Sequence, residues 1–227
     1  MNFIRARTSS LTVVVFVLLA ILLLQSGISY GSMFGKLEHF IPALHMPLLA
    51  ATWLVVRFAV MLLILGLWLL NKKQPLFRLI ILFNSLLTLG LVMNLTVLGD
   101  VLLGISAEAI KTLMIGIVFM LITNILIFSI WYWLIDPPGV EENPRDDTPW
   151  DFLFPQRAGP LPHYEFWIPR YTDYIFLAFS TSFAFSPTDT LPLTRRAKLL
   201  MLLQSTISII TITAIAGGAI NILAGTG

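Results

Sequence analysis

The chain has 227 residues, of which 57% are hydrophobic and only 11% are charged, and its formal net charge at pH 7 is +2. A soluble domain carries about 25% charged residues, so this composition excludes an ordinary water-soluble protein and favours a lipid bilayer as the surrounding medium. Cysteine is absent, which excludes a disulfide framework and thiolate chemistry. A net charge this small gives no reason to expect a nucleic-acid partner.

Apolar segments long enough to span a bilayer recur along the chain. A transmembrane helix needs about 20 mainly apolar residues. Segments of this kind cover residues 48–70, 77–98, 109–135 and 197–224. Together with an apolar segment near the N-terminus, they predict an all-α, polytopic membrane helix bundle of about five transmembrane helices.

The N-terminal segment allows two interpretations. Arg5 and Arg7 precede an uncharged stretch at residues 11–24, which has the length of the apolar region of a signal peptide. No clear A-x-A cleavage site follows, and apolar character continues to Ile28. We therefore favour an uncleaved first span over cleavage within residues 1–30.

The chain divides into three parts. Residues 1–135 predict a four-span helical bundle, and residues 136–170 predict a polar, proline-rich loop because they lack helical periodicity. Residues 171–227 contain a short apolar segment, Asp173 to Phe185, followed by the last transmembrane helix. This segment either enters the membrane and returns, or crosses it as a sixth helix. It is shorter than the ~20 residues of a full span, which favours the re-entrant alternative.

The distribution of lysine and arginine predicts the orientation in the membrane. Basic residues lie near the N-terminus, at Arg5 and Arg7, and between the second and third predicted spans, at residues 72–78. Because basic loops are retained on the cytoplasmic side, we expect the N-terminus and the 136–170 loop in the cytoplasm. The C-terminus is then expected outside.

Arg57 is a charged residue near the middle of the second predicted span. Placing an arginine at the centre of a bilayer costs at least ~2.5–3.5 kcal/mol, so its side chain should face protein or water. It is either a charge in a permeation path or ligand site, or a hydrogen-bonding hub for Asn84, Asn94 or Gln204. No acidic residue lies deep in a span, so a carbonyl, an amide or an anion must act as its partner.

Polar and small residues recur at helical spacing in the last predicted span. This face consists of Gln204, Ser208, Thr211 and Gly218. It predicts either the polar wall of an aqueous path or an interface where small and hydroxyl residues let helices approach closely. Of the two, we favour the packing interface.

The sequence contains no clear motif for a metal or a cofactor. The spacing of Glu38, His39 and His45 does not match a common metal site. The chain has no phosphate-binding loop, dinucleotide fingerprint or nucleophile elbow. We therefore expect neither a bound metal nor a cofactor.

Two motifs in the last third of the chain resemble a bacterial integral-membrane family of unknown function. The first is D-F-x-F-P-Q, at Asp151 to Gln156. The second is the block D-Y…A-F…A-F-S-P-T-D…P-L…A-K…M, which begins at Asp173 and ends at Met201. The resemblance implies a multi-pass protein of the bacterial cytoplasmic membrane and brings no established activity.

The same stretch resembles the pore-loop module of cation channels. Asp189, Pro192 and Thr194 match the D-x-x-P-x-T pattern that follows a selectivity filter, and the short apolar segment takes the place of the pore helix. The resemblance implies a constriction formed by Ser186, Pro187, Thr188 and Asp189. No glycine stands where a potassium filter has T-V-G-Y-G, so potassium selectivity is not expected.

Three functions are considered, in order. The first is a pore-loop-like ion channel or permeation protein of unknown selectivity, which must form a homo-oligomer to enclose a path. The second is a non-enzymatic accessory or scaffold subunit that docks a protein partner on the 136–170 loop. The third is a membrane enzyme acting on a lipid through Asp173, Asp189 and the basic cluster at 195–198. It ranks last because these carboxylates match no catalytic motif, so we do not expect an enzyme.

Overall fold

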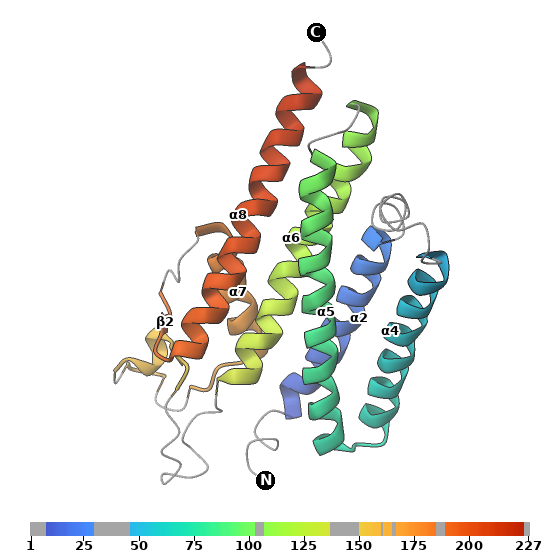
Figure 1. Cartoon of the computed structure of the whole chain (residues 1–227). Coiled ribbons are helices and arrows are strands. Elements are labelled where there is room, and N and C mark those ends of the chain that lie inside the picture. Colours follow the sequence, from blue (N-terminus) through green and yellow to red (C-terminus); the bar gives the residue numbers. More distant parts are fainter. Residues whose placement is uncertain are drawn as a thin grey trace.

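The structure is a computed structural model that describes residues 8–29, 46–102, 107–136, 150–159, 161–164, 167–184 and 189–224. The described residues form an all-α bundle with one small two-stranded sheet (Figure 1). The helices are α2 (Thr8–Ser29), α4 (Met46–Leu69), α5 (Lys73–Leu102), α6 (Ala107–Ile135), α7 (Tyr171–Ala184) and α8 (Arg195–Ala224), and the shorter elements are β1 (Phe152–Leu153), the 3-10 turn η2 (Pro155–Arg157) and β2 (Leu191–Pro192). The predicted helical membrane bundle is thereby confirmed.

Among the described residues, four helices contain stretches long and apolar enough to cross a membrane. These stretches are Thr52–Leu69, Lys73–Leu95, Ile115–Ile135 and Arg195–Gly218. The apolar stretch described in α2, Leu11–Ser26, is shorter, although the helix itself has 22 residues and is therefore about 33 Å long. The four long helices support a membrane protein, and the fifth span stays a prediction.

The turn between α4 and α5 shows how the chain ends one long helix and starts the next. Asn71 adopts a positive φ of 54°, a conformation that asparagine tolerates better than most residues. The N–H of Lys72 donates to the carbonyl of Leu67 at 3.0 Å, and the N–H of Asn71 donates to the carbonyl of Trp68 at 3.0 Å. This pair of bonds is the Schellman arrangement, which satisfies carbonyls at the helix end.

Helix α6 lies at the centre of the bundle. It packs against α2 and α5 on one side and against α7 and α8 on the other. In Figure 1, α2, α5 and α8 run in one direction, and α4 and α6 run in the opposite direction. Because α6 contacts four helices, the buried apolar side chains of all six helices form one continuous core around it.

Helix α7 enters the bundle and does not cross it. Its first residue, Tyr171, contacts Ser129 and Trp133 near the end of α6. After α7, the chain reappears at β2, which pairs antiparallel with β1 in the register Phe152↔Pro192. The start of α7, the sheet and the start of α8 thus share one end of the bundle (Figure 1), which we call the base.

The length of α7 agrees with this arrangement. Its 14 residues extend about 21 Å, which is shorter than the ~30 Å hydrocarbon core. The re-entrant alternative for the short apolar segment agrees with this length and with the position of β2 at the end of the bundle where α7 starts.

The described part of the 136–170 segment is built into the base. Phe152 is fully buried against Tyr132 of α6, with ring centroids 5.1 Å apart. Phe154 is 4% exposed and packs edge-on against Tyr174 of α7. Phe152 and Phe154 therefore contribute to the hydrophobic core, which the polar composition of the segment did not reveal.

Candidate functional sites

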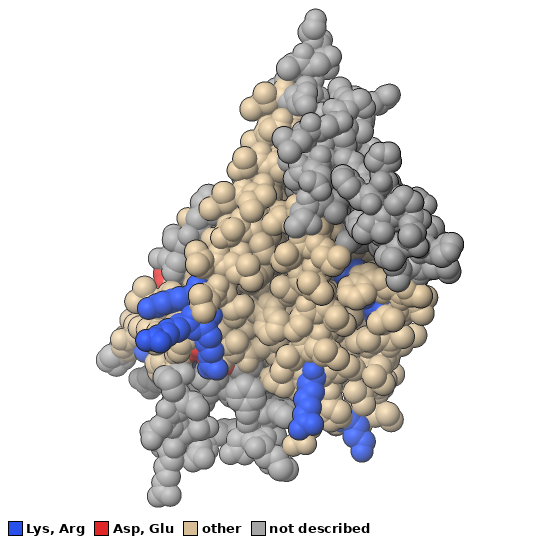
Figure 2. All heavy atoms as spheres, viewed as in Figure 1, with Lys and Arg blue, Asp and Glu red and all other residues tan. Residues whose placement is uncertain are grey.

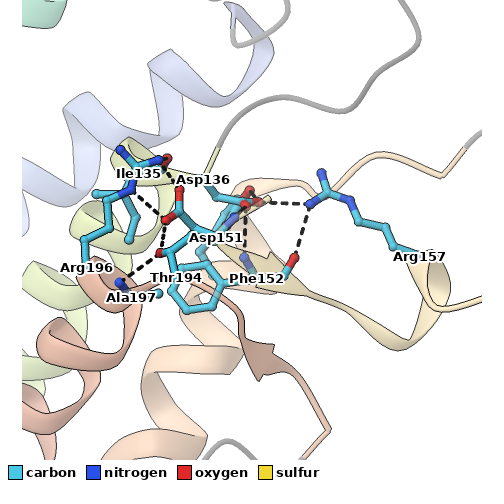
Figure 3. Close-up of polar contacts among 9 residues, drawn as sticks. Ile135, Asp136, Asp151, Phe152, Arg157, Thr194, Arg196 and Ala197 are labelled. Carbon is cyan, nitrogen blue, oxygen red and sulfur yellow. Dashed lines mark hydrogen bonds and ion pairs between the residues drawn. The ribbon is translucent and has the colours of Figure 1, made fainter. Parts of the chain in front are cut away.

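Asp136, the residue that follows α6, is a buried acceptor at the centre of the base (Figure 3). Its Oδ1 atom accepts the backbone N–H groups of Asp151 at 3.0 Å and Phe152 at 3.2 Å. Its Oδ2 atom accepts Nη1 of Arg157 at 3.1 Å and the hydroxyl of Tyr174 at 2.7 Å. Burial raises the pKa of the Asp136 carboxyl, and these donors act in the opposite direction.

A second buried carboxylate, Asp151, ties the base to the start of α8 (Figure 3). Its two oxygens bind the guanidinium of Arg196 through Nε, at 2.6 Å, and through Nη2. The hydroxyl of Thr194 donates to the same carboxylate, and Nη2 of Arg196 also donates to the carbonyl of Ile135 at 3.3 Å. A side-on, bidentate pair of this kind is both strong and directional.

These contacts give the D-F-x-F-P-Q motif a structural role. Asp151 binds Arg196, and the two phenylalanines fill the core below α6 and α7. Pro155 starts the 3-10 turn η2, which brings Arg157 back onto Asp136. The Arg157 guanidinium is also stacked on Trp150, 4.8 Å from the ring centroid. The motif therefore closes the base and supplies no obvious nucleophile or acid–base pair.

The sequence did not single out Asp136, Arg157 or Tyr174 as site residues. They lie in three different segments, and only the fold brings them together. One feature of the sequence could have indicated Asp136 as a site residue. It directly follows a long apolar span, and a carboxylate at the membrane boundary needs polar partners.

A polar seam joins α6, α7 and α8 inside the bundle. Nε2 of Gln204 donates to the carbonyl of Ala178 at 2.7 Å and to the hydroxyl of Ser182 at 2.8 Å. The hydroxyl of Tyr132 donates to Oε1 of the same glutamine. One turn further along α8, Ser208 accepts Nδ2 of Asn124 at 2.8 Å. The seam therefore couples all three helices through side chains.

The predicted polar face of the last helix coincides with this seam. Gln204, Ser208 and Thr211 are each 0% exposed, and Gly218 is buried as well. The hydroxyl of Thr211 bonds back to the carbonyl of Ile207 in its own helix. Within one chain, the face lies between helices and does not face an open path.

The predicted constriction is described only in part. Ser186, Pro187 and Thr188 lie outside the described residues. Asp189 is exposed, and the neighbouring Thr190 is 5% exposed. Asp173, considered for an enzyme, accepts the backbone N–H of Arg170 at 2.6 Å and so caps the start of α7. Glu38, His39 and His45, whose spacing does not match a common metal site, also lie outside the described residues.

Arg57 is a third candidate site, within the candidate span of α4. It is 2% exposed, and its guanidinium lies 5.7 Å from the ring of Trp53. The ion pairs among the described residues involve Arg157 and Arg196, so Arg57 has no carboxylate partner in that part of the chain. Its Nε and Nη2 atoms have no hydrogen-bond acceptor there either. The predicted hub with Asn84, Asn94 or Gln204 is thus not formed by these two nitrogen atoms.

Among the described residues, the structure has no group of three or more histidine, aspartate and glutamate side chains that could hold a metal ion. Comparisons with protein-family models, with curated proteins and with solved structures gave no match.

Proposed function

We propose that the protein is a non-enzymatic scaffold subunit of a membrane complex and that its base docks a partner protein. The observation that most supports this proposal is the environment of Gln204. It is fully buried, and its amide and carbonyl groups bond Tyr132, Ala178 and Ser182 of the same chain. The polar face that suggested a permeation path thus contributes to helix packing, as expected for an assembly subunit.

The base provides a surface suited to a protein partner. Leu161, Tyr164 and Ile168 are 42%, 46% and 39% exposed, and they lie outside the candidate spans. The three side chains lie close together in the sequence, and exposed apolar patches mark interaction sites. The ion pair between Arg157 and Asp136 anchors the preceding part of the same segment, which lowers the entropy lost when a partner binds.

We further propose that the base faces the cytoplasm of a bacterial cell. Most described lysine and arginine side chains on the visible face in Figure 2 gather at the starts of α5 and α8. Basic residues concentrate on the cytoplasmic side of membrane proteins, which supports this orientation and a C-terminus on the other side. The assignment to the bacterial inner membrane rests on the family resemblance of the D-F-x-F-P-Q motif.

The mass of the native assembly tests the scaffold proposal. Membranes from the native host are solubilised in mild detergent, and the mass of the tagged protein's complex is measured by light scattering. We expect a heteromeric complex for the wild type and for His163→Ser, which changes an exposed polar residue in the same loop. Combined Leu161→Ser, Tyr164→Ser and Ile168→Ser substitutions should release the partner. A wild-type mass that is a simple multiple of the 25.4 kDa chain contradicts the proposal.

The re-entrant helix favours a second candidate, an oligomeric permeation protein. Helix α7 starts and β2 follows at the same end of the bundle, as in a pore loop. One re-entrant segment does not enclose a path by itself, so this candidate requires a ring of identical chains.

Ion flux into liposomes tests this second candidate. The purified protein is reconstituted, and the uptake of sodium, potassium and chloride is compared with that of empty liposomes. A permeation protein should give flux that Asp189→Asn changes, since Asp189 is exposed beside the predicted constriction. Asp173→Asn is the matched control, because this carboxylate caps α7 at the base. Flux no greater than that of empty liposomes excludes the candidate.

A further inference from the structure

The first turn of α8 carries two exposed cations that no described carboxylate neutralises. Arg195 and Lys198 are exposed, and neither makes an ion pair among the described residues. Their neighbour Arg196 differs, since its guanidinium binds the buried carboxylate of Asp151 (Figure 3). Basic side chains gather over the start of α8 in Figure 2, and the first turn of this helix contains no acidic residue. The start of α8 therefore carries excess positive charge.

The spacing of the two cations suits a single anion. Arg195 and Lys198 are three residues apart in one helix, so they lie on the same side of it with Cβ atoms about 5–6 Å apart. Like charges at this spacing repel each other, and an anion between them offsets the repulsion. Guanidinium and ammonium groups both donate charge-assisted hydrogen bonds to phosphate oxygens. The pair therefore fits the charge of one phosphate group.

The same side of α8 is apolar beyond the two cations. Leu199, Leu202 and Ile209 are 65%, 64% and 46% exposed. With 3.6 residues per turn, these side chains continue the side that begins at Arg195, opposite the buried Gln204. The candidate span also begins at Arg195, so the cations lie at one end of the span and the apolar side chains lie within it. A charged end followed by exposed apolar surface is complementary to an amphiphilic ligand.

We propose that this side of α8 binds an anionic phospholipid of the surrounding bilayer, with the phosphate between Arg195 and Lys198 and an acyl chain along Leu199 and Leu202. An anionic lipid supplies the negative charge that the described chain lacks here, whereas a zwitterionic lipid brings its own cation. Each basic residue near an anionic lipid surface strengthens the attraction about fivefold, so the loss of both should weaken binding roughly 25-fold. The inference is independent of the scaffold proposal, which concerns exposed side chains of another segment.

The basic residues around the start of α5 provide a control of equal charge. Lys72 and Arg78 are both exposed, and neither makes an ion pair among the described residues. The positions three and four residues from Arg78 are Gln74, Pro75, Ile81 and Leu82. Arg78 therefore has no second cation at helical spacing. The double variant Lys72→Gln, Arg78→Gln removes the same two charges and leaves the proposed site intact.

Lipid titration of the purified, delipidated protein in nonionic detergent tests the site. Dioleoyl phosphatidylglycerol or dioleoyl phosphatidylcholine is added, and native mass spectrometry gives the Kd of the first bound lipid. The wild type should bind phosphatidylglycerol about tenfold more tightly than phosphatidylcholine or better. The double variant Arg195→Gln, Lys198→Gln should lose roughly 25-fold in affinity for phosphatidylglycerol, and the α5 double variant less than about threefold.

Two further arms identify the ligand and the role of the charges. Exchanging the two residues, as Arg195→Lys, Lys198→Arg, keeps both charges and should retain the wild-type Kd within about threefold. Inorganic phosphate in excess over the lipid should not displace phosphatidylglycerol, because it has no acyl chain to contact Leu199 and Leu202. Equal affinity for the two lipids, equal losses in the two glutamine double variants, or displacement by inorganic phosphate overturns the proposal.

Discussion

The hydroxyl of Tyr174 donates to Oδ2 of Asp136 over 2.7 Å, joining the first turn of the re-entrant helix to the residue that ends α6. The same oxygen accepts Arg157, and the other oxygen accepts two backbone N–H groups. Asp136 thereby fixes three segments that are distant in sequence. This single carboxylate explains how a short helix is held inside the bundle without crossing it.

Tyr174→Phe should lower the stability of the bundle. The substitution keeps the ring packed on Phe154 and removes one donor from a buried carboxylate. A hydrogen bond to a charged group contributes about 1.5–3 kcal/mol, so the unfolding free energy in detergent should fall by that order. Tyr164→Phe is the control, because Tyr164 is 46% exposed. Equal losses in the two variants would show that the bond to Asp136 contributes nothing.

Two adjacent arginines at the start of α8 should differ sharply in their contribution to the free energy of unfolding. Arg196 makes the bidentate pair with buried Asp151, whereas Arg195 is exposed and makes no ion pair among the described residues. Arg196→Ala should destabilise the protein by about 1–2 kcal/mol, because it removes the counter-charge of a buried carboxylate, although the Arg196 side chain itself is 61% exposed and screened by solvent. Arg195→Ala should change stability by less than ~0.5 kcal/mol.

Limited proteolysis of the base checks this difference in a second way. The loop around residues 158–164 should be cut faster in Arg196→Ala than in the wild type, since Asp151 no longer ties β1 to α8. Similar digestion of the two arginine variants would contradict the role given to the ion pair.

Gln204→Met distinguishes a packing role from a permeation role. Methionine matches the length of glutamine and cannot bond Tyr132, Ala178 or Ser182. If the seam holds the helices together, the unfolding free energy should fall by about 1–3 kcal/mol, because buried polar groups lose their partners. Thr206→Val is the control, since this exposed hydroxyl bonds only the carbonyl of Leu202 in its own helix. Unchanged stability together with altered ion flux would favour a water-lined face instead.

Single cysteines test the orientation of the base. The natural chain has no cysteine, so Ala158→Cys and Lys72→Cys each introduce one exposed reactive thiol. Both should react with a membrane-impermeant maleimide in inverted inner-membrane vesicles and stay unlabelled in intact spheroplasts. Labelling of Ala158→Cys from outside would reverse the charge-based topology.

The candidate sites show where reasoning from sequence reached its limit. The buried face of the last helix was predicted at Gln204 and Ser208 from their helical spacing alone, because residues four apart lie on one side of a helix. Arg57 was predicted to be shielded from lipid, and it is buried. The partners of these residues come from α2, α5, α6 and α7, and no periodicity within one helix specifies which neighbour it meets.

By itself, the sequence predicted an all-α membrane helix bundle in which one apolar segment is shorter than a full span. Long uncharged segments must hydrogen-bond their own backbone in lipid, and only helices do so within one segment. The tertiary structure alone decided that the chain is found again at the base in β2 after α7, and that Asp136 and Asp151 are buried there. These features depend on contacts between residues far apart in the sequence, such as Asp151 with Arg196, 45 positions apart, and such contacts form only when whole helices pack.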